Sequence, residues 1–142
     1  MRRMLMIAGA LALGMALSSP ALRAAQDEAA LDKTMKKAGP AFGAVRKATE
    51  AMAADTVKEN ATVLATVFAE TEAFFKTKGK ADAVKWAQDA AKVSQALAAQ
   101  AAKADWDGVK KSSTELGASC ASCHTAYRDK GPDGAYRLKP GN

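Results

Sequence analysis

Apolar residues recur at every third or fourth position along most of the chain, in four stretches separated by short polar segments. In the first stretch the recurring apolar positions include Leu31, Met35, Phe42 and Val45. This spacing places apolar side chains along one face of an amphipathic helix. The four predicted helices comprise residues 27–53, 56–76, 81–103 and 105–130. No segment alternates between apolar and polar residues as a half-buried strand does, so the sequence predicts an all-α fold.

The segments between the predicted helices are short, and short connections favour antiparallel packing of helices that are neighbours in sequence. We therefore expect an up-down-up-down four-helix bundle, in which the first helix starts at the end where the fourth helix finishes. Asp27 and Asp55 are predicted N-caps of the first two helices. Gly39 and Pro40 predict a kink or a short break in the first helix, because proline removes a backbone donor and clashes with the preceding turn.

Residues 1–24 have the pattern of a secretory signal peptide. Two arginines after the initiating methionine give a basic start, and 13 uncharged, largely apolar residues follow from Leu5 to Leu17. This run is shorter than the roughly 20 apolar residues that span a bilayer, although an uncleaved N-terminal anchor stays an alternative. Cleavage after Ala24 would leave residues 25–142 as one domain with one core. We expect this domain to be exported to the periplasm and not to insert into the membrane.

Near the C-terminus the chain reads Cys120-Ala-Ser-Cys123-His124, which is the C-x-x-C-H pattern for covalent attachment of a c-type haem. On one helical turn, two thiols at this spacing can each add to a haem vinyl group. The adjacent His124 can then bind the iron as its proximal ligand. The chain contains no other cysteine or histidine. The sequence therefore predicts one haem c, bound covalently through Cys120 and Cys123.

Three other interpretations of the two cysteines fit the sequence less well. A disulfide that closes such a short loop would constrain the unfolded chain little. A thioredoxin-like redox pair needs a βαβ setting, whereas the flanking sequence is helical. A structural zinc ion needs four ligands, and the cysteines and the histidine supply only three.

The charge of the chain limits the kinds of partner that it could bind. The predicted signal holds three of the 21 basic residues and none of the 15 acidic residues, so the remaining domain has a net charge of +3. This charge is too small, and too evenly interleaved with acidic residues, to indicate nucleic-acid binding. We expect a solvated surface with a weak electrostatic preference for an acidic redox partner protein.

Several further residues accompany the haem motif. They are Leu116 to Ser119 before it, Tyr127 and Arg128 after it, the pair Phe42 and Gly43, and Trp86. Together with the motif they resemble the class II cytochromes c, the cytochrome c′ family, over the whole of residues 25–142. The position of the motif near the C-terminus is the specific part of this resemblance. The resemblance implies a periplasmic four-helix bundle with one covalent haem, a role in electron transfer or gas binding, and, as in many members, a homodimer.

The position of Met35 separates two branches of that family. The low-spin branch carries an iron-binding methionine there, whereas the pentacoordinate members carry a bulky aliphatic residue. Met35 lies about 12 Å from the start of the first helix, and His124 lies about 9 Å from the end of the fourth helix. In an antiparallel bundle the two residues are therefore nearly level. Met52 lies about 37 Å along the first helix and is a predicted core residue. Met35 is therefore the predicted distal ligand, and an ordinary core methionine is the alternative.

The remaining candidate site residues have less specific roles. Tyr127 and Arg128 follow His124 by three and four residues, so both are expected near the haem-bearing face. Arg128 either pairs with a haem propionate or lies solvated at the helix end. The family's arginine near the propionates corresponds to Leu31 here, so that contact is not carried over. Phe42 is expected to line the haem pocket.

These features predict an electron carrier with His/Met ligation, rather than an enzyme. A gas-binding protein with an open distal position is the alternative, and Met35 is the residue that distinguishes the two. A small peroxidase is disfavoured, because the chain has no second histidine to act as a distal acid or base.

Overall fold

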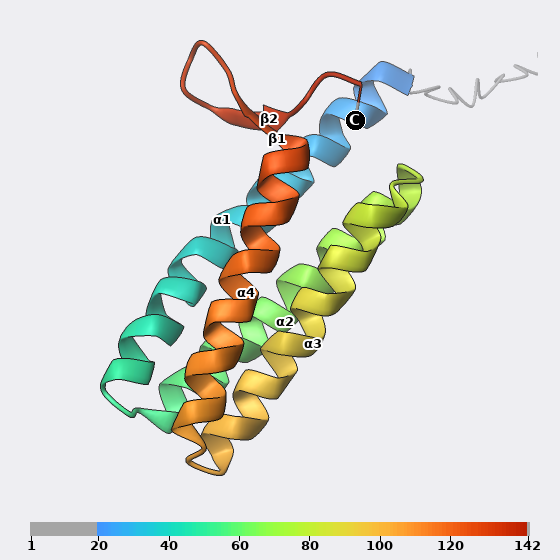
Figure 1. The fold of residues 1–142 in the computed structure, drawn as a ribbon. Coiled ribbons are helices and arrows are strands. Elements are labelled where there is room, and N and C mark those ends of the chain that lie inside the picture. The colour runs from blue at the N-terminus through green and yellow to red at the C-terminus, as the bar shows by residue number, and fades with distance from the viewer. Residues whose placement is uncertain (1–19, 142) are drawn as a thin grey trace, which may run out of the picture.

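The computed structural model describes residues 20–141, with side chains from Asp27 onward, as four helices and a two-stranded hairpin (Figure 1). The elements are α1 (Pro20–Glu50), α2 (Ala54–Thr77), α3 (Ala81–Ala102), α4 (Trp106–Tyr127), β1 (Arg128–Lys130) and β2 (Tyr136–Leu138). Consecutive helices run antiparallel and pack as an up-down bundle, which confirms the predicted helical architecture. Within the described part of the chain, no helix has both the length and the apolar character needed to cross a membrane. The predicted signal peptide, residues 1–24, lies outside the described residues, apart from the backbone of its last five, which belongs to α1.

The first helix is longer than predicted, and it is continuous. α1 begins at Pro20, and proline suits the first turn of a helix because its missing N–H would have no partner there. Asp27 therefore lies inside α1, and the prediction that it is the N-cap was wrong. α1 also continues through Pro40 without a break. Pro40 and Lys36, whose carbonyl loses its intrahelical donor, are both exposed, so water can replace that donor.

The connection between α1 and α2 corrects two further predictions. Met52, predicted in the core, is 60% exposed and has a left-handed φ of 53°. Because α1 ends at Glu50, Met52 no longer follows the apolar stripe of that helix. Asp55 lies in the first turn of α2, and Ala53 holds the N-cap position. An acidic side chain in the first turn still interacts favourably with the helix dipole.

The last three residues of the predicted fourth helix belong to a short hairpin instead, although the fold is all-α as predicted. α4 ends at Tyr127, and β1 pairs antiparallel with β2, with Arg128 opposite Leu138. The N–H of Gly131 donates to the carbonyl of Ala135 at 2.9 Å and closes the turn. Gly134 supplies the left-handed conformation that this turn needs, with a φ of 80°.

The core consists of two clusters. The main cluster draws on all four helices and contains Val45, Leu64, Leu97 and Leu116, each at most 1% exposed. Buried alanines lie among these residues and let the helix backbones approach closely. The smaller cluster contains Phe75, Ala83 and Tyr127. It lies at the end of the bundle that carries the α2–α3 connection and the hairpin (Figure 1).

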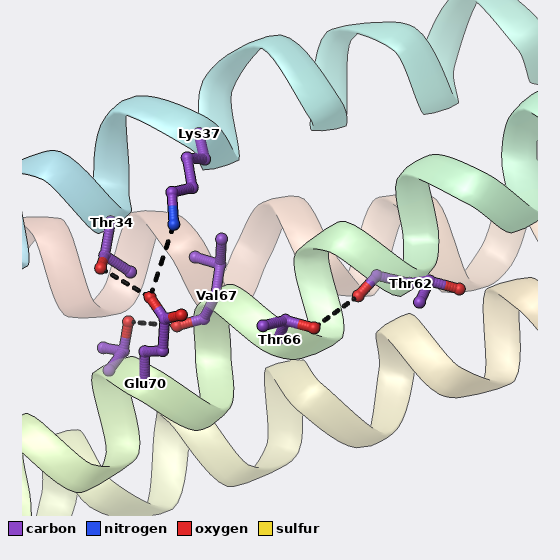
Figure 2. Close-up of polar contacts among 7 residues, drawn as sticks. Thr34, Lys37, Thr62, Thr66, Val67 and Glu70 are labelled. Carbon is purple, nitrogen blue, oxygen red and sulfur yellow. Dashed lines mark hydrogen bonds and ion pairs between the residues drawn. The ribbon is translucent and has the colours of Figure 1, made fainter.

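α1 is positioned mainly by α2, and it contacts α4 only little. Thr34 Oγ1 donates a hydrogen bond of 2.7 Å to Glu70 Oε2, and Lys37 Nζ lies 3.9 Å from the same oxygen (Figure 2). These contacts hold the N-terminal half of α1 against α2. Both α1 and α4 contribute side chains to the site described next.

Candidate functional site

A cavity of about 390 Å³ lies at the hairpin end of the bundle. All four helices and the hairpin contribute to its lining. Much of its wall is apolar and comes from Leu31, Phe68, Phe75, Trp86, Ala90 and Leu138. Charged side chains that include Glu28, Asp32 and Arg128 also line it. Its volume falls within the range of roughly 300–1,000 Å³ that is typical of small-molecule and cofactor pockets.

Five of the seven predicted site residues line this cavity, and two do not. Met35 reaches it from α1, whereas Cys123, His124 and Tyr127 come from α4 and Arg128 from β1. Met35 and His124 therefore line the same space from different helices. The remaining two residues pack against the main core.

The two predicted site residues outside the cavity lining are Cys120 and Phe42. Cys120 is half-buried, three residues before Cys123 on α4. The ring of Phe42 lies over Gly117, where a Cβ would be 3.5 Å from the Phe42 Cζ atom. Phe42 thus reaches α4 one turn before the haem motif, beside the cavity rather than in it.

The two thiols are free and partly shielded from water. Burial raises the pKa of Cys120, and burial together with the neighbouring Cys120 and Asp82 raises the pKa of Cys123 to about 11. Both thiols are therefore protonated near neutral pH. A reactive redox cysteine needs a lowered pKa, because the thiolate is the nucleophile. The environment of these cysteines thus disfavours a thiol–disulfide redox site.

His124 is a partly buried imidazole on the cavity wall. Burial lowers its pKa, and the positive charge of Arg128 lowers it further. The neutral imidazole is consequently the main form near neutral pH, and it is the form that binds metal ions. Among the described residues, no group of three or more His, Cys, Asp and Glu side chains is arranged to hold a metal ion, so a zinc site has no ligand set there.

Tyr127 fixes the end of α4 one turn after His124. Its hydroxyl donates a 2.6 Å hydrogen bond to Asp82 Oδ1 at the start of α3. This bond raises the pKa of Tyr127 to about 12 and lowers the pKa of Asp82. The Tyr127 ring also packs against Phe75 and Trp86, with ring centroids 5.0 Å and 6.3 Å away. The direction of the His124 side chain is thus set by a helix end that is anchored to both α2 and α3.

The hairpin covers one side of the cavity, and sequence reasoning missed it. The Arg128 guanidinium lies 4.1 Å from the centre of the Tyr136 ring, in a cation–π arrangement. Lys139 caps α4 through two hydrogen bonds. Its backbone N–H donates to the Tyr127 carbonyl at 2.9 Å, and its Nζ donates to the Thr125 carbonyl at 2.7 Å. The available signal was the run Gly-Pro-Asp-Gly at residues 131–134, which is typical of a turn between two strands.

The donor set and the lining fit a largely apolar, planar cofactor with a central metal ion. One neutral imidazole, from His124, and one thioether, from Met35, line the same space from different helices. Aromatic and aliphatic side chains supply the surrounding wall, and Cys123 lies one residue from the imidazole. Haem needs an apolar pocket with axial nitrogen or sulfur ligands, and these residues provide both.

No protein-family model, no curated protein and no solved structure matches this chain.

Proposed function

We propose that this chain is an exported electron-transfer protein of the class II cytochrome c type, with one covalently bound haem c. The observation that carries the proposal is that Cys123 and His124 of the C-x-x-C-H motif line one largely apolar cavity together with Met35. The neutral state favoured for His124 and the protonated thiols, which disfavour thiol redox chemistry, support the same assignment. Export to the periplasm follows from the signal-like residues 1–24, because haem is attached to c-type cytochromes outside the cytoplasmic membrane.

Each motif residue has a distinct role in this proposal. Cys120 and Cys123 hold the haem through thioether bonds, and His124 is the proximal ligand. Met35 is the distal ligand, and a thioether at this position favours the ferrous state and so raises the reduction potential. The bound haem supplies one-electron redox chemistry. The apolar residues of the wall keep water away from it, and the hydrogen bond from Tyr127 to Asp82 holds the α4 end that carries His124.

The proposal is tested by producing the full chain in a bacterial host with working haem-attachment machinery. We expect a mass equal to the cleaved chain plus one haem, which acid–acetone extraction does not reduce. The absorption spectrum should be that of a low-spin haem, with the weak near-infrared band of a thioether–ferric iron bond. Recovery of colourless protein with two free thiols would overturn the proposal.

A pentacoordinate gas-binding cytochrome is the outcome that would replace electron transfer. It would keep the covalent haem and His124 but leave Met35 unligated, as an ordinary methionine of the cavity wall. Its spectrum would be high-spin in the wild-type protein. The same purified sample therefore distinguishes both functions from each other and from a chain without haem.

A further inference from the structure

Positive charge is concentrated at the end of the bundle that carries the cavity. Residues 76–85 and 128–141, which form the α2–α3 connection with the start of α3 and the hairpin with the tail, contain eight basic and three acidic residues. Residues 27–37 of α1, at the same end, add three basic and three acidic residues. Residues 46–59 and 103–115, at the opposite end, contain six basic and six acidic residues (Figure 1). The small net charge of the whole domain thus hides a difference between its two ends.

Most of the cations at the cavity end have no carboxylate partner among the described residues. The basic face, as we call it, comprises Lys78, Lys80, Arg128, Lys130 and Lys139, none of which forms an ion pair within residues 27–141. Lys80 Nζ contacts the Gly141 carbonyl at 3.3 Å and Lys139 Nζ the Thr125 carbonyl at 2.7 Å. Carbonyl oxygens orient these ammonium groups without forming an ion pair with them, although Lys80 is close enough to Asp82 to lower the pKa of that carboxyl group.

Two contacts join the α2–α3 connection to the C-terminal segment, so that the basic face is one surface. Lys80 contacts Gly141 in the tail, and Asp82 accepts the hydrogen bond from Tyr127 at the end of α4. Tyr136 lies on the hairpin beside Arg128, and its side chain is 53% exposed. Tyrosine and arginine are the residue types that contribute most often to the centres of protein–protein interfaces.

We infer that the basic face is the docking surface for an acidic protein partner, with Tyr136 and Arg128 as its centre. This inference rests on the proposed function, and it identifies where the redox partner binds. Tyr136 and Arg128 also line the cavity, so a partner docked here would be close to the proposed haem. Complementary charges would accelerate its association and orient it. A protein fits better than a lipid surface, because the exposed Tyr136 beside Arg128 is of the kind enriched at the centres of protein–protein interfaces.

The first experiment measures the local charge that an approaching redox reagent encounters. The ferrous holoprotein is oxidised by ferricyanide, an anion, and by tris(phenanthroline)cobalt(III), a cation, over a series of ionic strengths; each reagent takes one electron from the haem iron. We expect the ferricyanide rate constant to fall with added salt and the cobalt rate constant to rise. Lys78→Gln combined with Lys130→Gln should lower the ferricyanide rate constant several-fold at low ionic strength.

The matched control is Lys110→Gln combined with Lys111→Gln. These lysines are exposed, lie at the opposite end of the bundle, and form no ion pair among the described residues. The control changes the net charge equally and should leave both rate constants nearly unchanged. Equal effects of the two double variants would mean that only the total charge matters, which would overturn the inference.

The second experiment does not depend on electron transfer. Poly-glutamate, an acidic peptide, is titrated into isotopically labelled protein, and the amide NMR signals are followed. The amide signals that shift on addition of the peptide should belong to residues 76–85 and 128–141. In the Lys78→Gln, Lys130→Gln double variant, the peptide should no longer cause these shifts. Perturbations spread over both ends would contradict a docking face, and so would tighter, charge-dependent binding to phosphatidylglycerol vesicles than to the peptide. A protein that lacks haem but shows the mapped shifts would refute the proposed function and keep the acidic docking surface.

Discussion

At the scale of single residues, the two methionines outside the predicted signal provide an internal comparison. Met35 lines the cavity with His124, whereas Met52 is exposed in the connection at the opposite end of the bundle. Met35→Leu should remove the distal thioether, convert the haem from low-spin to high-spin and accelerate carbon monoxide binding. Met52→Leu is the control, and it should leave the spectrum and the binding rate unchanged. A wild-type protein that is already high-spin, with a spin state that Met35→Leu does not change, would assign the site to the gas-binding alternative.

The hydrogen bond between Tyr127 and Asp82 predicts a pH dependence of stability. The pKa of Tyr127 is raised from 10 to about 12 in the folded protein. The resulting stabilisation is present below pH 10 and is lost as the pH rises from about 10 to about 12. In urea titrations, the free energy of unfolding of the wild type should therefore decrease over this interval more than that of Tyr127→Phe.

The same hydrogen bond also predicts a loss of stability at low pH, through the Asp82 carboxyl group. The pKa of Asp82 is lowered in the folded state, so its contribution is present above the ordinary aspartate pKa and is lost as the pH falls through the folded value. Tyr127→Phe should weaken this acid-side loss as well. Parallel stability curves for the two proteins at both extremes of pH would show that the bond contributes nothing.

At the scale of elements, two glycines of α4 should respond oppositely to alanine. A Cβ on Gly117 would meet only the Phe42 ring at 3.5 Å, an ordinary contact, so Gly117→Ala should stabilise the helix by about 0.5–1 kcal/mol. A Cβ on Gly108 would lie 2.8 Å from Asp105 Cγ and displace the N-cap carboxylate, whose Oδ1 accepts from the Gly108 N–H at 3.0 Å. Gly108→Ala should cost about 1 kcal/mol. Chemical denaturation checks both signs, and a stabilised Gly108→Ala protein would contradict the cap.

The helices were predictable from the sequence because their apolar periodicity is strong, but their ends were not. The spacing of apolar residues does not show where a helix ends. Met52 continues the apolar spacing of the first helix and was therefore predicted in the core, although the helix ends at Glu50 and Met52 is exposed. Pro40 was expected to kink or briefly break α1; α1 has no break there, because the exposed position of Pro40 lets water replace the lost donor. The hairpin was missed because three-residue strands are too short to show alternation, and only its turn residues indicated it.

In the candidate site, too, some positions could be predicted from the sequence and others could not. Met35 and His124 line one cavity, as expected from antiparallel packing, although α1 begins at Pro20 and α4 ends at Tyr127, so the distances reckoned from the predicted helix ends do not hold. The position of Tyr136 on the cavity wall could not be predicted, because it depends on the hairpin that follows α4. The partner of the Tyr127 hydroxyl, Asp82, was equally hidden, since 45 residues separate the two in sequence. Contacts between distant segments are set by packing, which periodicity does not record.

At the scale of the whole molecule, the two ends of the bundle differ. One end has a packed core, and the other contains the cavity proposed to bind haem. The main cluster joins all four helices through Val45, Leu64, Leu97 and Leu116. At the other end, α1 and α4 both line the cavity, and these two helices contact each other less than the helix pairs that are neighbours in sequence do. Haem bound there would add contacts between α1 and α4, and binding to the folded state alone stabilises that state.

This asymmetry predicts where the protein should loosen when haem attachment is prevented. In the full chain with Cys120→Ala and Cys123→Ala, far-UV circular dichroism should keep most of the helical signal, because the main cluster does not include the cavity wall of α1. Hydrogen exchange followed by mass spectrometry should show faster exchange than in the holoprotein at residues 28–36, which line the cavity from α1. Residues 41–48 and 109–116, which contribute to the main cluster, should stay protected in both proteins, because local opening depends on local buried contacts. Uniform loss of protection would mean that the two ends fold as one unit, and unchanged exchange at residues 28–36 would mean that α1 does not depend on the haem for its position.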